Sequence, residues 1–216
     1  MKPGLYSVGL CVPTGRMVSE QADELARLAE VYGSGEIRLT TGQNAILFNV
    51  MEDRLDDLIA EPLLEQFSPN PHPNVAGLVT CTGSDYCSLG LIDTKRVGRW
   101  VTEELIKQYP EAPPITMHWS GCPAGCGNHQ AADIGFQGIR TRVDDKVVDG
   151  VQIFVGGRTG NQGRPGVRIM DLIPVDTLKD ILPVVIKHLE LLKQVQRESK
   201  KEKLVLMVPA MTQDSL

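Results

Sequence analysis

The chain has 216 residues, a formal net charge of −5 and a hydrophobic fraction of 42%. These values suit one large globular domain or two small ones, and the acidic balance without a basic block argues against nucleic-acid binding. No apolar run approaches the roughly 20 residues that cross a bilayer, and the N-terminus has no signal-peptide core. We expect a cytoplasmic protein, in which grouped cysteines serve metal binding or catalysis more often than disulfides.

The first 66 residues alternate between strand and helix patterns. The expected elements are a strand over 5–12, a helix over 19–32, strands over 36–40 and 45–50, and a helix over 53–66 that is broken near Pro62. The TGQN turn joins the two adjacent strands as a hairpin. This βαββα order predicts a small α+β unit whose helices cover one face of an antiparallel sheet.

The segment SPNPHPN, residues 68–74, separates two regions, because its three prolines can hardly continue a helix or strand. We expect one domain over residues 1–68 and a second over residues 75–216. The elements expected in the second region are strands over 77–80 and 115–119, a helix over 93–109, a hairpin of strands 133–142 and 147–155, and a helix over 176–203.

Four of the five cysteines form two pairs, and each pair follows an expected strand. Cys81 and Cys87 lie in TCTGSDYC, and Cys122 and Cys126 lie in GCPAGC. Four thiolates suit a structural zinc ion or an iron–sulfur cluster. The five-residue spacer of the first pair is unusual for zinc, and the surrounding glycines let the backbone approach a bulky group. A cluster is therefore favoured over zinc, and both are favoured over a set of buried free cysteines.

The sequence around these pairs resembles a known family. TCTGSDYCSLGLIDTK and ITMHWSGCPAGCGNHQAADIGFQG are similar to the cluster domain of the ferredoxin-dependent nitrite and sulfite reductases in their order, spacers, Gly-Cys-Pro opening and ADIGF strand. VGLCVPTGR and YGSGEIRLTTGQNAILFNV resemble the ferredoxin-like half-domain that precedes it. The resemblance implies an α+β protein, with a ferredoxin-like half-domain followed by an α/β domain for siroheme and a [4Fe-4S] cluster.

The same resemblance assigns roles to residues. It implies that one [4Fe-4S] cluster is held by Cys81, Cys87, Cys122 and Cys126. It also implies that Cys126 bridges the cluster to the siroheme iron. Arg38 is the preferred partner for siroheme carboxylates, because a guanidinium pairs bidentately with them. Other candidate cations are Arg16, Arg140, Arg142 and Arg158.

Several further residues lie close to these motifs. Gln43 and Asn44 are expected near the macrocycle, with a purely structural role in the turn as the alternative. His118 and His129 flank the second cysteine pair, and we expect both to be packed, with a hydrogen bond from His129 to cluster sulfide or substrate as the alternative. Cys11 is expected in the core. No residue is assigned a catalytic role.

The full-length reductases resemble two fused copies of this unit, and this chain matches the copy that carries the cluster. We therefore expect a half-size enzyme that reduces nitrite or sulfite with electrons from a one-electron donor such as ferredoxin. Because buried siroheme carboxylates need cations, a homo-oligomer or a partner half is also expected. The alternative is a non-catalytic [4Fe-4S] electron-transfer module or an accessory subunit of a split reductase.

Overall fold

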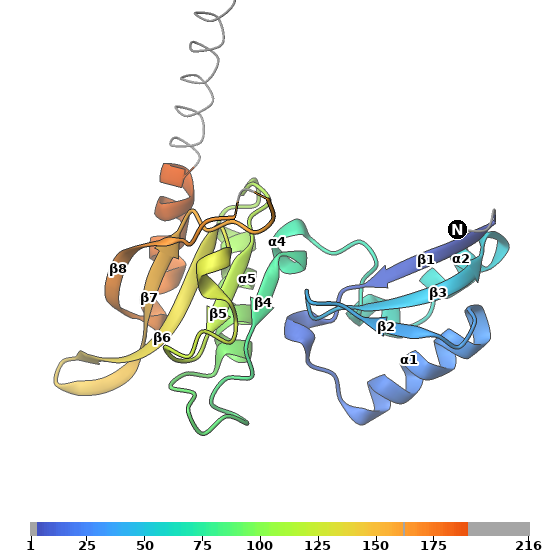
Figure 1. Cartoon of the computed structure of the whole chain (residues 1–216), viewed down its shortest axis with the longest axis horizontal. Coiled ribbons are helices and arrows are strands. Elements are labelled where there is room, and N and C mark those ends of the chain that lie inside the picture. Colours follow the sequence, from blue (N-terminus) through green and yellow to red (C-terminus); the bar gives the residue numbers. More distant parts are fainter. Residues whose placement is uncertain (1–3, 162, 190–216) are drawn as a thin grey trace, which may run out of the picture.

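The computed structural model describes residues 4–161 and 163–189. These residues form two lobes, and each lobe is built on its own sheet (Figure 1). The first sheet contains β1–β3 and the second contains β4–β8. None of the described helices has the length and apolar character needed to cross a membrane.

The first lobe is a three-stranded antiparallel sheet with the order β1-β3-β2. Its elements are β1 (Leu5–Leu10), α1 (Ser19–Tyr32), β2 (Ile37–Leu39) and β3 (Ala45–Met51). Leu25, Leu28 and Ala29 recur at helical spacing on α1, so they form a buried stripe in the core of this lobe. The expected strands are confirmed, with β1 and β2 shorter than expected and β3 one residue longer, and the helix has the expected bounds.

The helix expected over 53–66 is three short pieces instead. They are η2 (Glu52–Arg54), α2 (Leu55–Ile59) and α3 (Leu63–Gln66). The break lies where Pro62 caps α3, since proline has no backbone N–H to continue a helix from the preceding turn. The pieces still bury Leu58, Leu63 and Leu64 in the core of the first lobe.

The second lobe is a five-stranded mixed sheet with the order β4-β5-β6-β7-β8. Its strands are β4 (Leu78–Thr80), β5 (Met117–Ser120), β6 (Ile134–Val143), β7 (Lys146–Val155) and β8 (Val167–Pro174). The first three are parallel, and the last two continue antiparallel from β6. Trp119 and Phe136 stack in its core with ring centroids 3.9 Å apart.

Helices complete the second lobe. α5 (Thr94–Gln108) and the helical residues 178–189 contribute buried apolar side chains to the same core as the sheet. The helix expected over 93–109 is confirmed, and the one expected over 176–203 is described only as far as residue 189, so its remainder lies outside the described residues. A short helix, α4 (Pro73–Ala76), begins at the end of the proline-rich segment, where no element was expected. Proline is well tolerated in the first turn of a helix, which explains this start.

β8 was not predicted from the sequence. It is an edge strand whose residues are mostly exposed, so it lacks the alternation of apolar and polar residues that marks a half-buried strand. Its pairing with β7 extends the sheet beyond the hairpin of β6 and β7, which was predicted correctly.

Candidate functional site

The two cysteine loops leave the same edge of the second sheet. β4 and β5 are parallel neighbours, and Thr80 at the end of β4 is paired with Trp119 near the end of β5. Cys81 follows directly on β4, and Cys122 comes two residues after β5. Because the carboxyl ends of parallel neighbours meet at one edge, the tertiary structure brings together loops that are 40 residues apart in the chain.

Backbone hydrogen bonds join the two loops. The N–H of Leu91, in the first loop, donates to the carbonyl oxygen of Gly121 at 2.8 Å. The N–H of Gly121 in turn donates to Sγ of Cys81 at 3.1 Å. Cys81 is also anchored by its own N–H, which donates to the carbonyl oxygen of Trp119 at 2.9 Å. The Cys81 sulfur therefore lies against the residue that precedes Cys122.

Two glycines show how closely the backbones approach around this site. Gly83 has φ +74°, a conformation that side chains rarely adopt, and a Cβ there would lie 2.8 Å from the Thr94 nitrogen. Gly138, on β6, lies under the second loop, and a Cβ on it would lie 2.6 Å from the Gly121 oxygen. A side chain is therefore excluded both at Gly83 in the first cysteine loop and at Gly138 in the sheet.

None of the five cysteines, all of which are among the described residues, forms a disulfide. The free thiols are those of Cys11, Cys81, Cys87, Cys122 and Cys126. Cys81, Cys87 and Cys122 are partly buried, and Cys126 is exposed, whereas Cys11 is buried in the first lobe as expected. Among residues 4–161 and 163–189, no three His, Cys, Asp or Glu side chains converge on a position for one metal ion.

The number and placement of these thiols fit the ligand set of a [4Fe-4S] cluster. A [4Fe-4S] cluster is larger than an ion, and its thiolates surround it rather than meet at one point. Four free thiols on two loops at one sheet edge supply the required ligand set. The N–H of Gly121 already points at the Cys81 sulfur, which is the kind of donor that stabilises a ligating thiolate.

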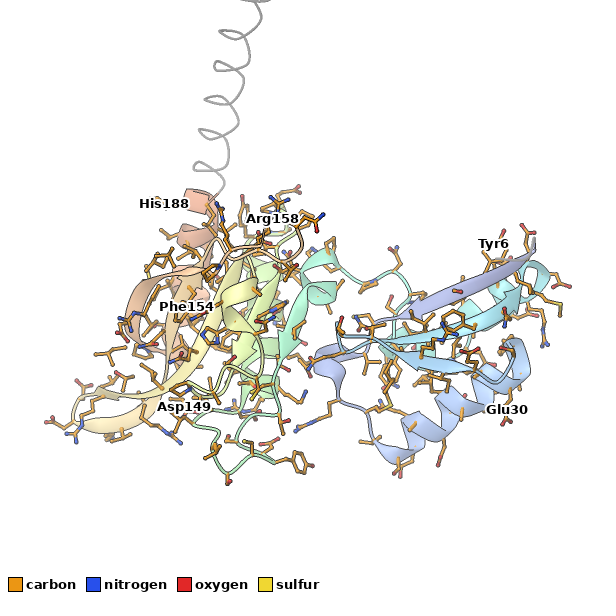
Figure 2. All side chains as sticks on the ribbon, in the orientation of Figure 1. Tyr6, Glu30, Asp149, Phe154, Arg158 and His188 are labelled. Atoms are coloured by element: carbon orange, nitrogen blue, oxygen red, sulfur yellow. The ribbon has the colours of Figure 1, made fainter. Side chains whose placement is uncertain are left out.

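His129 and Ser120 stabilise the loop that carries Cys122 and Cys126 through hydrogen bonds. His129 is buried, and its Nδ1 lies 2.9 Å from Oγ of Ser120, which also accepts the N–H of Gly127 at 3.1 Å. Burial lowers the pKa of His129, so its ring is neutral at pH 7. The ring packs beside Phe154, with centroids 4.8 Å apart, in the region of β7 where Figure 2 labels Phe154. The expected packing of His129 is therefore observed.

His118 also contacts the loop that carries Cys122 and Cys126. Its Nδ1 lies 3.1 Å from the carbonyl oxygen of Asn128. Burial lowers the pKa of His118, although the Asn128 backbone and Asp133 act in the opposite direction. Both histidines thus contact the second cysteine loop as neutral rings.

Gln43 joins the first lobe to the start of the first cysteine loop. Its Nε2 donates to the Thr80 carbonyl oxygen at 2.6 Å, and its Oε1 accepts the Thr80 N–H at 3.0 Å. β4 is the edge strand of its sheet, so the amide of Gln43 pairs with it as a neighbouring strand would. Gln43 thereby contacts Thr80, the residue that precedes Cys81, and its expected place near the macrocycle stays a prediction.

Asn44 and Arg38 lie in the first lobe with local partners. Oδ1 of Asn44 accepts the N–H of Val12 at 2.9 Å, which is the structural role in the turn given as the alternative. Nε of Arg38 donates to Oε1 of Glu36 at 2.6 Å, and its guanidinium lies 4.3 Å from the Phe48 ring centroid. The Arg38 side chain is 61% exposed, so its charge is accessible.

Two residues at the start of α5 were not identified from the sequence. Oγ1 of Thr94 donates to the carbonyl oxygen of Cys81 at 2.8 Å and lies 3.7 Å from its sulfur. Nζ of Lys95 donates to the carbonyl oxygen of Thr14 at 2.6 Å. The sequence contains no spacing that links these residues, because Thr14 lies on η1 (Pro13–Gly15) and Cys81 directly after β4, both distant along the chain.

The two lobes, the mixed sheet and the two cysteine loops define an α+β protein with a candidate iron–sulfur site. The chain belongs to the nitrite and sulfite reductase family. The family model described as the nitrite and sulphite reductase 4Fe-4S domain matches residues 72–212, and that of the nitrite/sulfite reductase ferredoxin-like half domain matches residues 1–64. The α+β fold class and the family expected from the sequence are confirmed. Proteins of this family bind siroheme and a [4Fe-4S] cluster.

Individual relatives agree with this assignment. The chain is 45% identical to ferredoxin–nitrite reductase of Synechococcus elongatus over 83% of its own length and 35% of that protein. It is 46% identical to the chloroplastic ferredoxin–nitrite reductase of Spinacia oleracea over 84% of its own length and 30% of that protein. The structure of the NirA protein of Mycobacterium tuberculosis matches with a TM-score of 0.79 and 29% identity, over 86% of this chain and 35% of that chain.

These matches cover the chain well but the relatives poorly. The chain spans about a third of the length of the relatives named above. The family is therefore shown for this chain, whereas about two thirds of each longer protein lies outside the match.

Proposed function

We propose that this chain forms the siroheme and [4Fe-4S] part of an oxidoreductase that reduces nitrite or sulfite. The observation that carries the proposal is the pair of cysteine loops at one edge of the second sheet, joined by the hydrogen bonds of Gly121. In this proposal, residues 1–68 are the ferredoxin-like half-domain, and residues 75–216 form the domain that binds both cofactors.

The proposed cluster ligands are Cys81, Cys87, Cys122 and Cys126. Cys126 is the exposed member of this set, which supports its role as the thiolate shared with siroheme, since a second cofactor must reach it from outside. The cluster would supply electrons singly to the iron at which the substrate is reduced. The chain itself would supply the four thiolates, and the N–H of Gly121 would donate to the Cys81 sulfur.

Arg38, Gln43 and Asn44 are proposed to support the macrocycle in different ways. Gln43 holds the first lobe against the end of β4, next to Cys81. Asn44 keeps the turn in place through Val12. The accessible charge of Arg38 is available to a siroheme carboxylate, which would compete with Glu36 for the guanidinium.

A ferredoxin-type donor, a cytoplasmic location and an oligomer or partner half belong to the same proposal. The donor follows from the names of the relatives, which are ferredoxin–nitrite reductases. The free thiols of the described residues suit a reducing compartment. Exposed apolar side chains support a partner, because Tyr86 and Leu89 in the first cysteine loop and Leu39 on β2 are all more than two-thirds exposed.

The absorption spectrum and metal content of anaerobically purified protein test the proposal together. We expect about four iron and four sulfide per chain, with red-region siroheme bands and reduction of nitrite or sulfite by a chemical donor. Iron and sulfide without siroheme bands would favour the electron-transfer module instead. Stoichiometric zinc without iron would refute both. Light scattering on the loaded protein tests assembly, and an active monomer would rule out the need for a partner.

A further inference from the structure

Lys95 is a half-buried cation near the start of the loop that carries Cys81. It is the second residue of α5, and its ammonium lies between the two lobes, where it donates to the carbonyl oxygen of Thr14 at 2.6 Å. Oγ1 of Thr80 lies 3.5 Å from the same nitrogen. Because Thr80 immediately precedes Cys81, this charge is placed at the end of the strand that carries the first proposed ligand.

The charge of Lys95 is not balanced by a carboxylate at ion-pair distance among the described residues. Three arginines line a pocket between the lobes together with Lys95, and each of them has a carboxylate partner: Arg16 pairs with Asp85, Arg96 with Asp93 and Arg99 with Glu103. Burial and then the Arg16 guanidinium lower the pKa of Lys95, whereas Cys81 and Asp93 act in the opposite direction. A cation in this position is stabilised when negative charge is present at Cys81.

Other groups also favour negative charge on Cys81. The Gly121 N–H donates to its sulfur at 3.1 Å. Thr94 is the first residue of α5, so the positive end of a 15-residue helix also points toward this cysteine. Lys95 adds a full charge to a set of partial charges directed at one ligand.

We propose that Lys95 is a positioning residue that raises the reduction potential of the cluster through its charge near Cys81, while its hydrogen bond holds the two lobes together. The inference rests on the proposed function, because it requires a cluster on Cys81. One electron from the donor adds one negative charge at the cluster, and a nearby cation stabilises that form more than the oxidised form. Lys95 forms no covalent bond and keeps its proton.

The test separates charge from packing with three variants of the full chain. Lys95→Met removes the charge and the hydrogen bond, Lys95→Gln removes the charge but keeps a donor, and Lys95→Arg keeps the charge. Lys107→Met is the matched control, because Lys107 lies in the last turn of the same helix and pairs with Glu104 at the surface. Iron and sulfide content, the thermal unfolding midpoint and the cluster midpoint potential from an EPR-monitored dithionite titration are measured for each.

We expect Lys95→Met and Lys95→Gln to retain iron and to shift the midpoint potential to more negative values, while Lys95→Arg and Lys107→Met stay near the wild type. An iron-loaded neutral variant with an unchanged potential overturns the inference, even if its unfolding midpoint falls. If neither neutral variant holds a cluster but Lys95→Arg does, the charge is required to bind the cluster rather than to set its potential, and the inference fails. If Lys95→Arg also loses iron, the role is one of packing and the inference fails. A wild-type chain without iron refutes the proposed function itself.

Discussion

Replacing Gly138 by alanine should disrupt the cysteine loops from the sheet beneath them. A Cβ at this position would lie 2.6 Å from the Gly121 oxygen and 2.9 Å from the Gly121 carbonyl carbon, whereas ordinary contacts begin at 3.4 Å. The carbonyl must therefore move by about 0.8 Å, or β6 must bend away from it. Because the Leu91 N–H donates to this same oxygen at 2.8 Å, the movement breaks the hydrogen bond that joins the two loops.

The expected cost combines overpacking and a lost hydrogen bond. Overpacking a core costs about 1–3 kcal/mol and the hydrogen bond about 1 kcal/mol, so the free energy of unfolding should fall by about 2–4 kcal/mol. For a chain of this size the thermal midpoint should fall by roughly 5–15 °C. We also expect a loss of iron, because Gly121 precedes Cys122 and donates to the Cys81 sulfur.

Calorimetry and iron analysis of anaerobically purified protein check this expectation. Gly9→Ala is the matched control, because Gly9 is also a strand glycine but a Cβ there would have no neighbour within 4 Å. A Gly138→Ala protein with native iron content and a midpoint equal to that of Gly9→Ala would refute the reasoning. It would mean that the second loop does not depend on the close approach of β6.

Three further predictions follow from the site. Cys126→Ser should remove siroheme absorption or visibly alter it, while Cys11→Ala, in the core of the first lobe, should leave the cluster spectrum unchanged. Gln43→Ala should lower the free energy of unfolding, measured in urea, by about 2 kcal/mol, because two hydrogen bonds to Thr80 are lost. An unchanged value would mean that these bonds do not stabilise the contact between the lobes. Burial lowers the pKa of His118 and His129 in the folded chain. Below about pH 6.5 these histidines are therefore protonated more readily in the unfolded chain, and the free energy of unfolding should fall. His129→Gln should reduce that acid loss in urea titrations at pH 7 and at about pH 5.5, and an identical loss would contradict the assignment.

The amino-acid sequence determined those features that depend on local pattern and spacing. The stripe of apolar residues predicted the α1 helix and Gly33 marked its end, and the spacing of the cysteine pairs placed two cysteine loops after two strands. The resemblance around these pairs identified the family, which the family models match over nearly the whole chain. Each of these signals lies within a few residues of the feature that it predicts.

Only the tertiary structure decided which distant groups meet at the site. Gln43 pairs with the open edge of β4, and Lys95 reaches the carbonyl oxygen of Thr14, although neither pattern nor spacing connects these positions. β8 likewise could not be predicted from the sequence, because an exposed edge strand buries too few side chains to require alternating apolar and polar residues. Backbone carbonyls and amides are the same in every residue, so the contacts they make across the chain leave no trace in the side-chain sequence until the fold brings them together.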